Sequence, residues 1–253
     1  MRCDVLICAA ILAAGLPTLT GADVIPADPA TAAFVTANIA ATLYHEVGHA
    51  LIAIRKIRLA GSEEDAADAL SALLIDRFHE EGAAQDVIRQ VADAYLLYDA
   101  QGAAGGQRWV YGDAHSLDPA RHDNLVCLFY GADAGAREDL ADELGLPGPR
   151  RESCPEEFQA AADDWDRWLD GMPPQDHGPG LRLVVPPDRD ALTATVATEV
   201  RRLNGEYGLP VPVDVTVEPC GEANAFYDPR ARRIVICTEY ATELARLYAA
   251  GAK

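Results

Sequence analysis

The chain has 253 residues, of which 49% are hydrophobic, so it can bury a core as one large domain or two small ones. Its formal net charge is -19 at pH 7. Because phosphate binding requires clustered Lys and Arg, and the sequence contains no basic stripe, the composition argues against nucleic acid and anionic membrane surfaces as partners.

The first 22 residues predict a cleaved secretory signal. Arg2 supplies a short basic start, Val5 to Leu16 is apolar, and Thr20 to Ala22 offers small residues for cleavage. A buried N-terminal helix and a membrane anchor are the alternatives, but the apolar run is shorter than the roughly 20 residues of a membrane span. We therefore expect a secreted or periplasmic protein with no membrane span after signal removal.

The first mature element is a helix that carries the sequence "HEVGH". Asp28 and Pro29 form a typical helix start, and an Ala-rich helical pattern continues to about Ile57. Within it, His45 and His49 are four residues apart, so both imidazoles lie on one face of the helix.

This spacing is that of the HExxH motif of zinc hydrolases. His45 and His49 can bind one ion, and Glu46 can reach a water molecule on that ion. Zinc lowers the pKa of such a water toward roughly 7, and a glutamate can then take its proton. The alternative is a helix that holds two solvated histidines. The apolar neighbours Leu43 and Leu51 favour burial instead, and burial without a partner costs several kcal/mol.

The next helix supplies candidates for a third metal ligand. Ser62 can cap the segment "SEEDAADALSALLIDRFHEEG", in which Glu64 and Asp68 are again four residues apart. We assign Glu64 as the ligand and Asp68 as the carboxylate that orients a ligand histidine. Glu63 competes for the ligand role. The alternative is an acidic first turn that complements the helix dipole, which suits Glu63 and Asp65 well.

Further helices are expected over about 84–97, 119–130, 132–144 and 155–169, with a Gly-rich loop at 100–107. Hydrolysis of a peptide needs a side chain that stabilises the tetrahedral oxyanion. The candidates are His115, Tyr111 and Arg121, and we assign a catalytic role to His115. The alternative is that "SLDP" forms a helix cap and that His115 merely lies near it. The other histidines show no partner pattern and are expected at the surface: His79, His122 and His177.

A linker at 171–180 separates the helical part, 23–170, from a C-terminal part, 181–253. The latter has a strand at "LRLVV", a capped helix, a Val-rich strand at "VPVDVTVE", a hairpin that turns at Asp228 and Pro229, and a closing helix. We describe this part as a βαββα-like unit. The fold class is therefore α+β, with a mainly helical catalytic part.

Four cysteines remain after signal removal, and an even number in an exported protein suggests two disulfides. Three pairings are possible, and we favour Cys127 with Cys154 and Cys220 with Cys237. The second pair flanks the hairpin, whose ends should lie close together. None of the four has CxxC spacing, which argues against a cysteine-based zinc site.

The two helix motifs together resemble the gluzincin metallopeptidases, in which HExxH on one helix is completed by a Glu followed four residues later by Asp or Asn. "LYHEVGHALI", "GSEEDAADAL", "HSLD" and "NAFYDP" more specifically resemble a family of secreted bacterial metallopeptidases known by a domain of unknown function. The resemblance implies a zincin-like fold and one Zn²⁺ held by His45, His49 and Glu64. Glu64 follows His49 by only 15 residues, so the intervening loop must turn tightly.

The segment "NAFYDPRARRIVIC" is similar to the edge strand of neprilysin-like peptidases, which pairs with the substrate backbone. The resemblance implies that Asn224, Ala225 and Phe226 contact substrate. In those enzymes the strand precedes the HExxH helix, whereas here it follows it. We therefore expect the C-terminal part to pack back beside the motif helix and complete the cleft. The alternative is a disulfide-linked hairpin with no substrate role.

These features predict a zinc metalloendopeptidase, a hydrolase that cleaves a peptide or protein substrate with Glu46 as general base. One alternative is an inactive binding or inhibitor module that keeps the fold. A second is an intramembrane HExGH protease, which would require several apolar spans that the sequence after residue 22 does not provide. The sequence predicts no oligomeric state.

Overall fold

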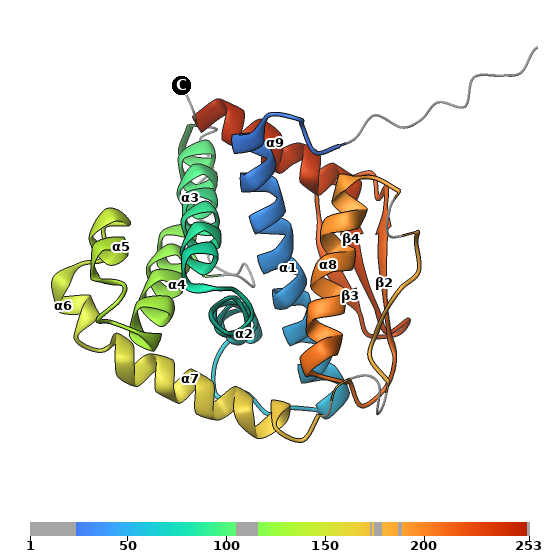
Figure 1. Cartoon of the computed structure of the whole chain (residues 1–253), viewed down its shortest axis with the longest axis horizontal. Coiled ribbons are helices and arrows are strands. Elements are labelled where there is room, and N and C mark those ends of the chain that lie inside the picture. The colour runs from blue at the N-terminus through green and yellow to red at the C-terminus, as the bar shows by residue number, and fades with distance from the viewer. Residues whose placement is uncertain (1–23, 105–115, 173, 175–178, 187–188, 252–253) are drawn as a thin grey trace, which may run out of the picture.

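A computed structural model of the chain describes residues 24–104, 116–172, 174, 179–186 and 189–251. The predicted signal at 1–22, Tyr111, His115 and His177 lie outside the described residues. The fold is mainly helical with one small sheet, which confirms the α+β class (Figure 1). No described helix is long and apolar enough to cross a membrane.

The other helices of the N-terminal part lie mainly on one side of the motif helix α1 (Pro29–Arg55), which is near the centre of the molecule (Figure 1). Asp28 caps α1 by accepting from the Thr31 N–H, as the sequence predicts. The other helices of this part are α2 (Glu63–Phe78), α3 (Glu81–Ala104), α4 (Asp118–Ala132), α5 (Glu138–Glu143), α6 (Gly148–Arg151) and α7 (Cys154–Leu169). Helix α3 is longer than expected, and α6 was not expected.

The C-terminal part contains β1 (Leu181–Leu183), α8 (Ala191–Glu206), β2 (Val213–Glu218), β3 (Ala225–Asp228), β4 (Arg233–Cys237) and α9 (Thr238–Gly251). It has one strand more than the βαββα description, because the hairpin supplies both β3 and β4. The strand order is β1-β2-β4-β3, with β1, β2 and β4 parallel and β3 antiparallel to β4. Strand β3 is therefore an edge strand.

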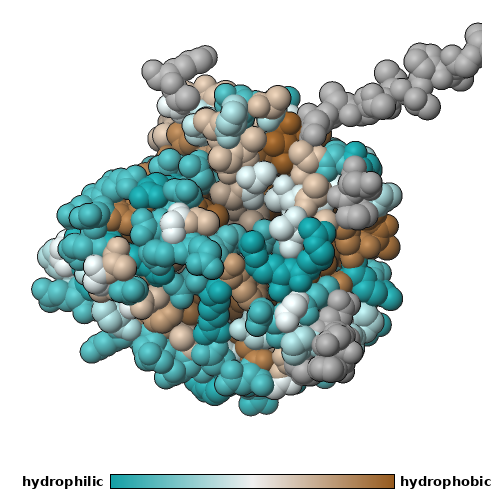
Figure 2. All heavy atoms as spheres, in the orientation of Figure 1, coloured by the Kyte–Doolittle hydropathy of each residue, from teal (hydrophilic) through white to brown (hydrophobic). Residues whose placement is uncertain are grey.

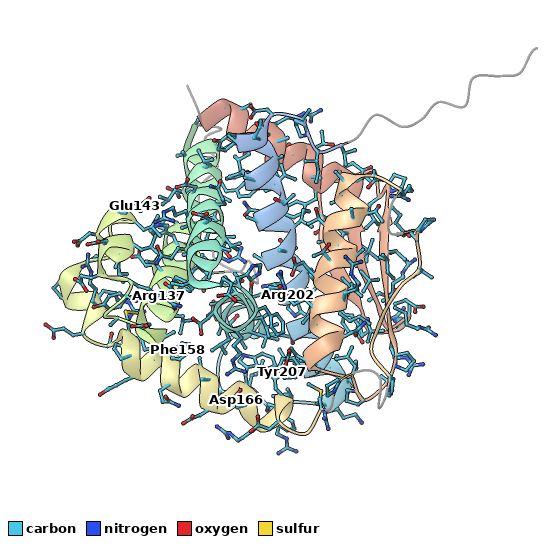
Figure 3. All side chains as sticks on the ribbon, in the orientation of Figure 1. Arg137, Glu143, Phe158, Asp166, Arg202 and Tyr207 are labelled. Carbon is cyan, nitrogen blue, oxygen red and sulfur yellow. A yellow bond between two sulfur atoms is a disulfide. The ribbon has the colours of Figure 1, made fainter. Side chains whose placement is uncertain are left out.

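The two parts pack together around α1, which contacts α8, β3, β4 and α9. Buried side chains from both parts form one hydrophobic cluster. A polar network crosses the same boundary: the Tyr44 hydroxyl donates to Glu199 of α8, and Arg202 also donates to Glu199, at 2.8 Å. Arg202 and Tyr207 lie at the α8 end beside α2 (Figure 3). The division at 171–180 stays a prediction.

Two disulfides link the pairs favoured from the sequence. Cys127–Cys154 joins α4 to the start of α7, and Cys220–Cys237 joins the loop before β3 to the end of β4. Glu239 also accepts from the backbone N–H groups of Cys220 and Gly221, at 3.0 and 2.8 Å. The loop that leads into β3 is thus fixed at several points.

The expectation that the remaining histidines lie at the surface is wrong for His122, which is only 4% exposed between the helices of the N-terminal part. His79 is half-buried near Arg202, with 3.0 Å between the imidazole Nε2 and the guanidinium. On the face seen in Figure 2, the outer surface is mostly hydrophilic with scattered apolar residues, as the acidic composition leads one to expect.

Candidate metal centre

Three nitrogen and oxygen atoms from α1 and α2 converge at one point. The Nε2 atoms of His45 and His49 are 3.0 Å apart, and Glu64 Oε2 lies 3.2 Å from the first and 3.4 Å from the second. Among the described residues, these three form the only cluster of His, Cys, Asp and Glu side chains placed to bind a metal ion. Histidine spacing on α1 and the position of Glu64 in the first turn of α2 bring them together.

Each imidazole is held by a carboxylate on its other nitrogen. His45 Nδ1 lies 2.8 Å from Asp68 Oδ1, and His49 Nδ1 lies 2.8 Å from Glu63 Oε1. Since an ionised carboxylate only accepts hydrogen bonds, each Nδ1 atom is the donor in its pair, and the Nε2 atom of the neutral imidazole is the one that can bind a metal ion. Asp68 is the carboxylate that the sequence analysis assigned to orienting a ligand histidine, and this role stays a prediction; Glu63 was left as a rival ligand or a dipole-compensating residue.

Asp68 is in turn fixed by Arg121 of α4. The guanidinium donates from Nε to Asp68 Oδ2 and from Nη2 to Asp68 Oδ1, both at 2.8 Å, and stacks 4.5 Å from the centre of the Tyr95 ring. Although burial opposes ionisation of Asp68, the hydrogen bonds from Arg121 and His45 lower the pKa of its carboxyl to about 2. Arg121, a candidate oxyanion stabiliser from the sequence, is thus occupied by Asp68.

The local charge favours a cation. Glu46, Glu63, Glu64 and Asp68 bring four carboxylates to the two histidines, and Arg121 compensates only one. Burial lowers the pKa of His45, but hydrogen bonds to Asp68 and Glu64 outweigh it and raise that pKa to about 9. In the protein without metal, a proton can therefore partly offset the negative charge; a divalent ion does so more completely.

Glu46 lies beside the cluster and is only 5% exposed. Burial raises the pKa of its carboxyl above the ordinary value of 4.5, although both histidines and a hydrogen bond from the Tyr227 backbone N–H lower it. Glu46 therefore lies between the ligand cluster and the edge strand β3.

Helices α1 and α2 approach closely at Gly48, inside the HEVGH sequence. A Cβ atom at Gly48 would lie 3.0 Å from Ala67 Cα and 3.1 Å from Ala67 Cβ. Lys56 adopts a left-handed conformation (φ 54°) at the end of α1, and Ser62 caps α2, so the connecting loop turns tightly as expected. The Trp165 indole of α7 donates to the Ala66 carbonyl at 3.1 Å and supports α2 from outside.

Strand β3 forms one wall of the cleft at this cluster. A hollow of about 370 Å³ is lined by His45, Glu46, His49 and Glu64 on one side and by Asn224, Ala225 and Phe226 on the other. The three residues expected to contact substrate thus lie opposite the HExxH residues. This arrangement is the one expected for a C-terminal part that packs back onto α1.

The model of the DUF4344 family, described as "Putative metallopeptidase", matches residues 4–169 and 190–253. The chain belongs to this family. Neither a curated protein nor a solved structure matches it. Membership in a metallopeptidase family indicates a metal ion and peptide or protein substrates.

The donor set fits a zinc ion. Zinc binds imidazole nitrogen and carboxylate oxygen at about 2.0–2.2 Å in tetrahedral geometry, so neighbouring ligand atoms are about 3.3–3.6 Å apart. The separations of 3.0, 3.2 and 3.4 Å in this DUF4344 protein are close to that range. Two imidazoles and one carboxylate leave a fourth position open, as in catalytic rather than structural zinc sites.

Proposed function

We propose that this DUF4344 protein is a zinc-dependent endopeptidase, with one Zn²⁺ bound by His45, His49 and Glu64. The convergence of three ligand atoms, with both Nδ1 atoms held by carboxylates, is the observation that supports it most strongly. When bound, the ion would supply Lewis acidity, which polarises the substrate carbonyl and makes water a better nucleophile at neutral pH.

Glu46 is proposed as the general base. Its carboxylate takes a proton from the attacking water and later gives a proton to the nitrogen of the leaving amine. One C–O bond forms, the C–N bond of the peptide breaks, and one water molecule is consumed. The raised pKa of the buried carboxyl suits both steps, because a base with a pKa closer to the working pH also returns the proton readily.

Strand β3 is proposed to bind the substrate backbone. The Asn224 carbonyl accepts from the Cys237 N–H at 3.1 Å, so the backbone groups of Asn224 and Phe226 face β4, by the alternation of an antiparallel pair. Ala225, between them, directs its N–H and C=O to the free edge, where a peptide can add as a further strand. His115 stays a candidate for stabilising the oxyanion.

We also propose that the protein acts in the periplasm or outside the cell. The two disulfides support this, because such bonds persist in oxidising compartments. The acidic surface and the cleft dimensions are consistent with a soluble substrate that reaches the site in an extended conformation.

The test compares Glu46→Gln with the wild type and with Glu206→Gln, a change of the same chemistry at an exposed position at the end of α8. Zinc content and kcat/KM on a peptide library are measured for all three. We expect Glu46→Gln to bind one zinc and to lose roughly 10²–10⁴-fold in kcat/KM, while Glu206→Gln behaves as the wild type. A wild type that binds zinc and cleaves no peptide would favour the binding or inhibitor module instead.

A further inference from the structure

The hollow of the cleft has two ends with different surroundings. At one end are the ligand cluster and its carboxylates, of which Glu46, Glu63 and Glu64 line the hollow. At the other end the walls are Ala53 of α1 and Pro229, which directly follows β3. Neither of these two residues is charged, so the charge of this second end is determined by the side chains that surround it.

Helix α1 and strand β3 leave the ligand cluster in the same direction. Ala41 of α1 and Ala223 line a second cavity, of about 180 Å³, on one side of the cluster, whereas Ala53 and Pro229 line the hollow on the other side. The end of α1 and the hairpin turn after β3 therefore lie together, at the end of the hollow that is remote from the cluster.

Three exposed cationic side chains belong to this remote end, and we call them the basic end: Lys56, Arg230 and Arg232. Lys56 follows Ala53 by three residues, a spacing that makes neighbours on a helix surface. Arg230 directly follows Pro229, and Arg232 lies in the same turn. The charge of Arg232 also acts on Tyr227, which lines the hollow: burial raises the pKa of the Tyr227 hydroxyl, and Arg232 opposes that rise.

The cations of the basic end have no ionic partner in the part of the chain that the structure describes. None of the three forms an ion pair with a described carboxylate, whereas the neighbouring Arg233 pairs with Glu218. The carboxylate of Asp228, in the same hairpin, accepts from the backbone N–H groups of Arg230 and Ala231 at 2.8 and 3.2 Å. Three cations thus face one carboxylate that already stabilises the turn, in a chain with 21 Lys and Arg against 40 Asp and Glu.

An extended chain that pairs with β3 passes the basic end. Antiparallel pairing is slightly more stable per residue than parallel pairing, and it places the N-terminal portion of the substrate at the hollow. Pro229 follows Ala225 by four residues, and a strand advances about 3.4 Å per residue. With the scissile bond beside Glu46 and Ala225, the third and fourth residues before the bond therefore lie at the remote end.

We propose that the basic end binds acidic side chains at the third and fourth residues before the scissile bond, so that the enzyme favours peptides with Asp or Glu there. The inference rests on the proposed peptidase function. It makes Lys56, Arg230 and Arg232 specificity-determining residues, although the molecule as a whole, with a formal net charge of -19, repels acidic peptides.

The test uses the zinc-loaded protein and pairs of peptides that differ only in Glu or Gln at these two positions. At about 20 mM salt, the Glu peptide should have a kcat/KM roughly tenfold higher than the Gln peptide, mainly through a lower KM. Because the charges are exposed, the ratio should fall toward one at about 0.5 M salt.

The variant with both Arg230→Gln and Arg232→Asn should lose most of this ratio and cleave the Gln peptide as the wild type does. Asparagine suits position 232, where the backbone is left-handed (φ 50°). Arg230→Glu should reverse the preference, from Glu peptides to Lys peptides, which keeps the test decisive if the double variant does not fold. Arg246→Gln is the control, since Arg246 is exposed on α9, forms no ion pair with a described residue and does not line the hollow.

The outcomes separate this inference from the proposed function. Equal cleavage of the Glu and Gln peptides by the wild type, or an acidic preference confined to positions after the bond, would overturn the inference and leave the peptidase function intact. A loss of preference in Arg246→Gln as large as in the double variant would show that overall charge, and not the basic end, is responsible. If no peptide is cleaved, both proposals fail.

Discussion

At the scale of single residues, the candidate metal centre depends on the carboxylates that orient the two histidines as well as on the histidines themselves. Asp68 and Glu63 orient the two imidazoles from the same turn-and-a-half of α2. They differ in their surroundings: the Glu63 side chain is 51% exposed, whereas that of Asp68 is 21% exposed and is fixed by Arg121. The better-ordered carboxylate should contribute more to metal binding.

We expect Asp68→Asn to weaken zinc binding by roughly 10–100-fold, the usual cost of losing such a carboxylate, and Glu63→Gln to weaken it less. Asp65→Asn is the control, since Asp65 lies in the same stretch of α2 but contacts Ser116. Competition with a chelator gives the three affinities. An equal loss in Asp65→Asn, or none in Asp68→Asn, would show that orientation of His45 does not control affinity.

At the scale of elements, the site depends on how closely α2 approaches α1. Gly48 permits this approach, and Glu64 and Asp68 flank its contact residue Ala67 on α2. An added methyl group has no free space there, so the helices must move apart, and the carboxylates of α2 move with them.

Gly48→Ala should therefore reduce zinc affinity and also cost about 1–3 kcal/mol of unfolding free energy, although alanine favours helix over glycine. Gly205→Ala in α8 is the matched control: nothing lies within 4 Å of an added Cβ, so a small gain in stability is expected. Urea unfolding and zinc titration measure both effects. If Gly48→Ala were as stable as Gly205→Ala and bound zinc normally, the close approach would be irrelevant to the site.

At the scale of the whole molecule, a buried arginine joins the helices that surround the centre. The Arg137 side chain is 5% exposed and contacts Asp76 of α2, Glu81 of α3 and the Phe129 carbonyl of α4 at 2.6–2.7 Å (Figure 3). Removing one partner of a buried pair leaves the others uncompensated, so Arg137→Ala should cost about 3 kcal/mol of unfolding free energy. Arg167→Ala, at an exposed pair with Asp164, should change little.

The ion pair between Arg137 and Glu81 predicts that the stability of the fold depends on pH. The hydrogen bond from Arg137 lowers the pKa of the Glu81 carboxyl below its ordinary value of 4.5. The pair therefore stabilises the fold fully above pH 4.5, and this stabilisation is lost as the pH falls through the lowered pKa. Between about pH 5 and pH 3, the wild type should lose more unfolding free energy than Arg137→Ala, in which Glu81 has no such partner. Parallel pH curves in urea unfolding would contradict this.

The part of the site that follows from local periodicity could be predicted from the sequence. The spacing of His45 and His49, and of Glu64 and Asp68, places each pair on one helix face whatever the rest of the fold does. The contacts that depend on how the helices pack against one another could not be predicted from the sequence. Glu63 contacts His49, and Arg121 contacts Asp68, only because of the way in which α1, α2 and α4 pack together. His122 was misplaced for the same reason, since nothing in its local sequence marks the helix face that becomes buried.

The same distinction holds for the larger architecture. Capping residues, strand alternation and the hairpin turn were sufficient to predict most of the helices and strands. The positions of the cysteines favoured both observed disulfides. No local pattern relates Tyr240 of α9 to Tyr95 of α3, which share a cavity only through tertiary packing. The short helix α6 was also not predicted, because it lies in a segment whose sequence is typical of a loop.

The most direct test is to locate the ion itself, by anomalous X-ray diffraction at the zinc edge from crystals of the zinc-loaded protein. One peak is expected, within about 2.0–2.2 Å of the Nε2 atoms of His45 and His49 and of a Glu64 carboxylate oxygen. A peak at other residues, or none in protein that contains zinc by elemental analysis, would contradict a catalytic centre between α1 and α2.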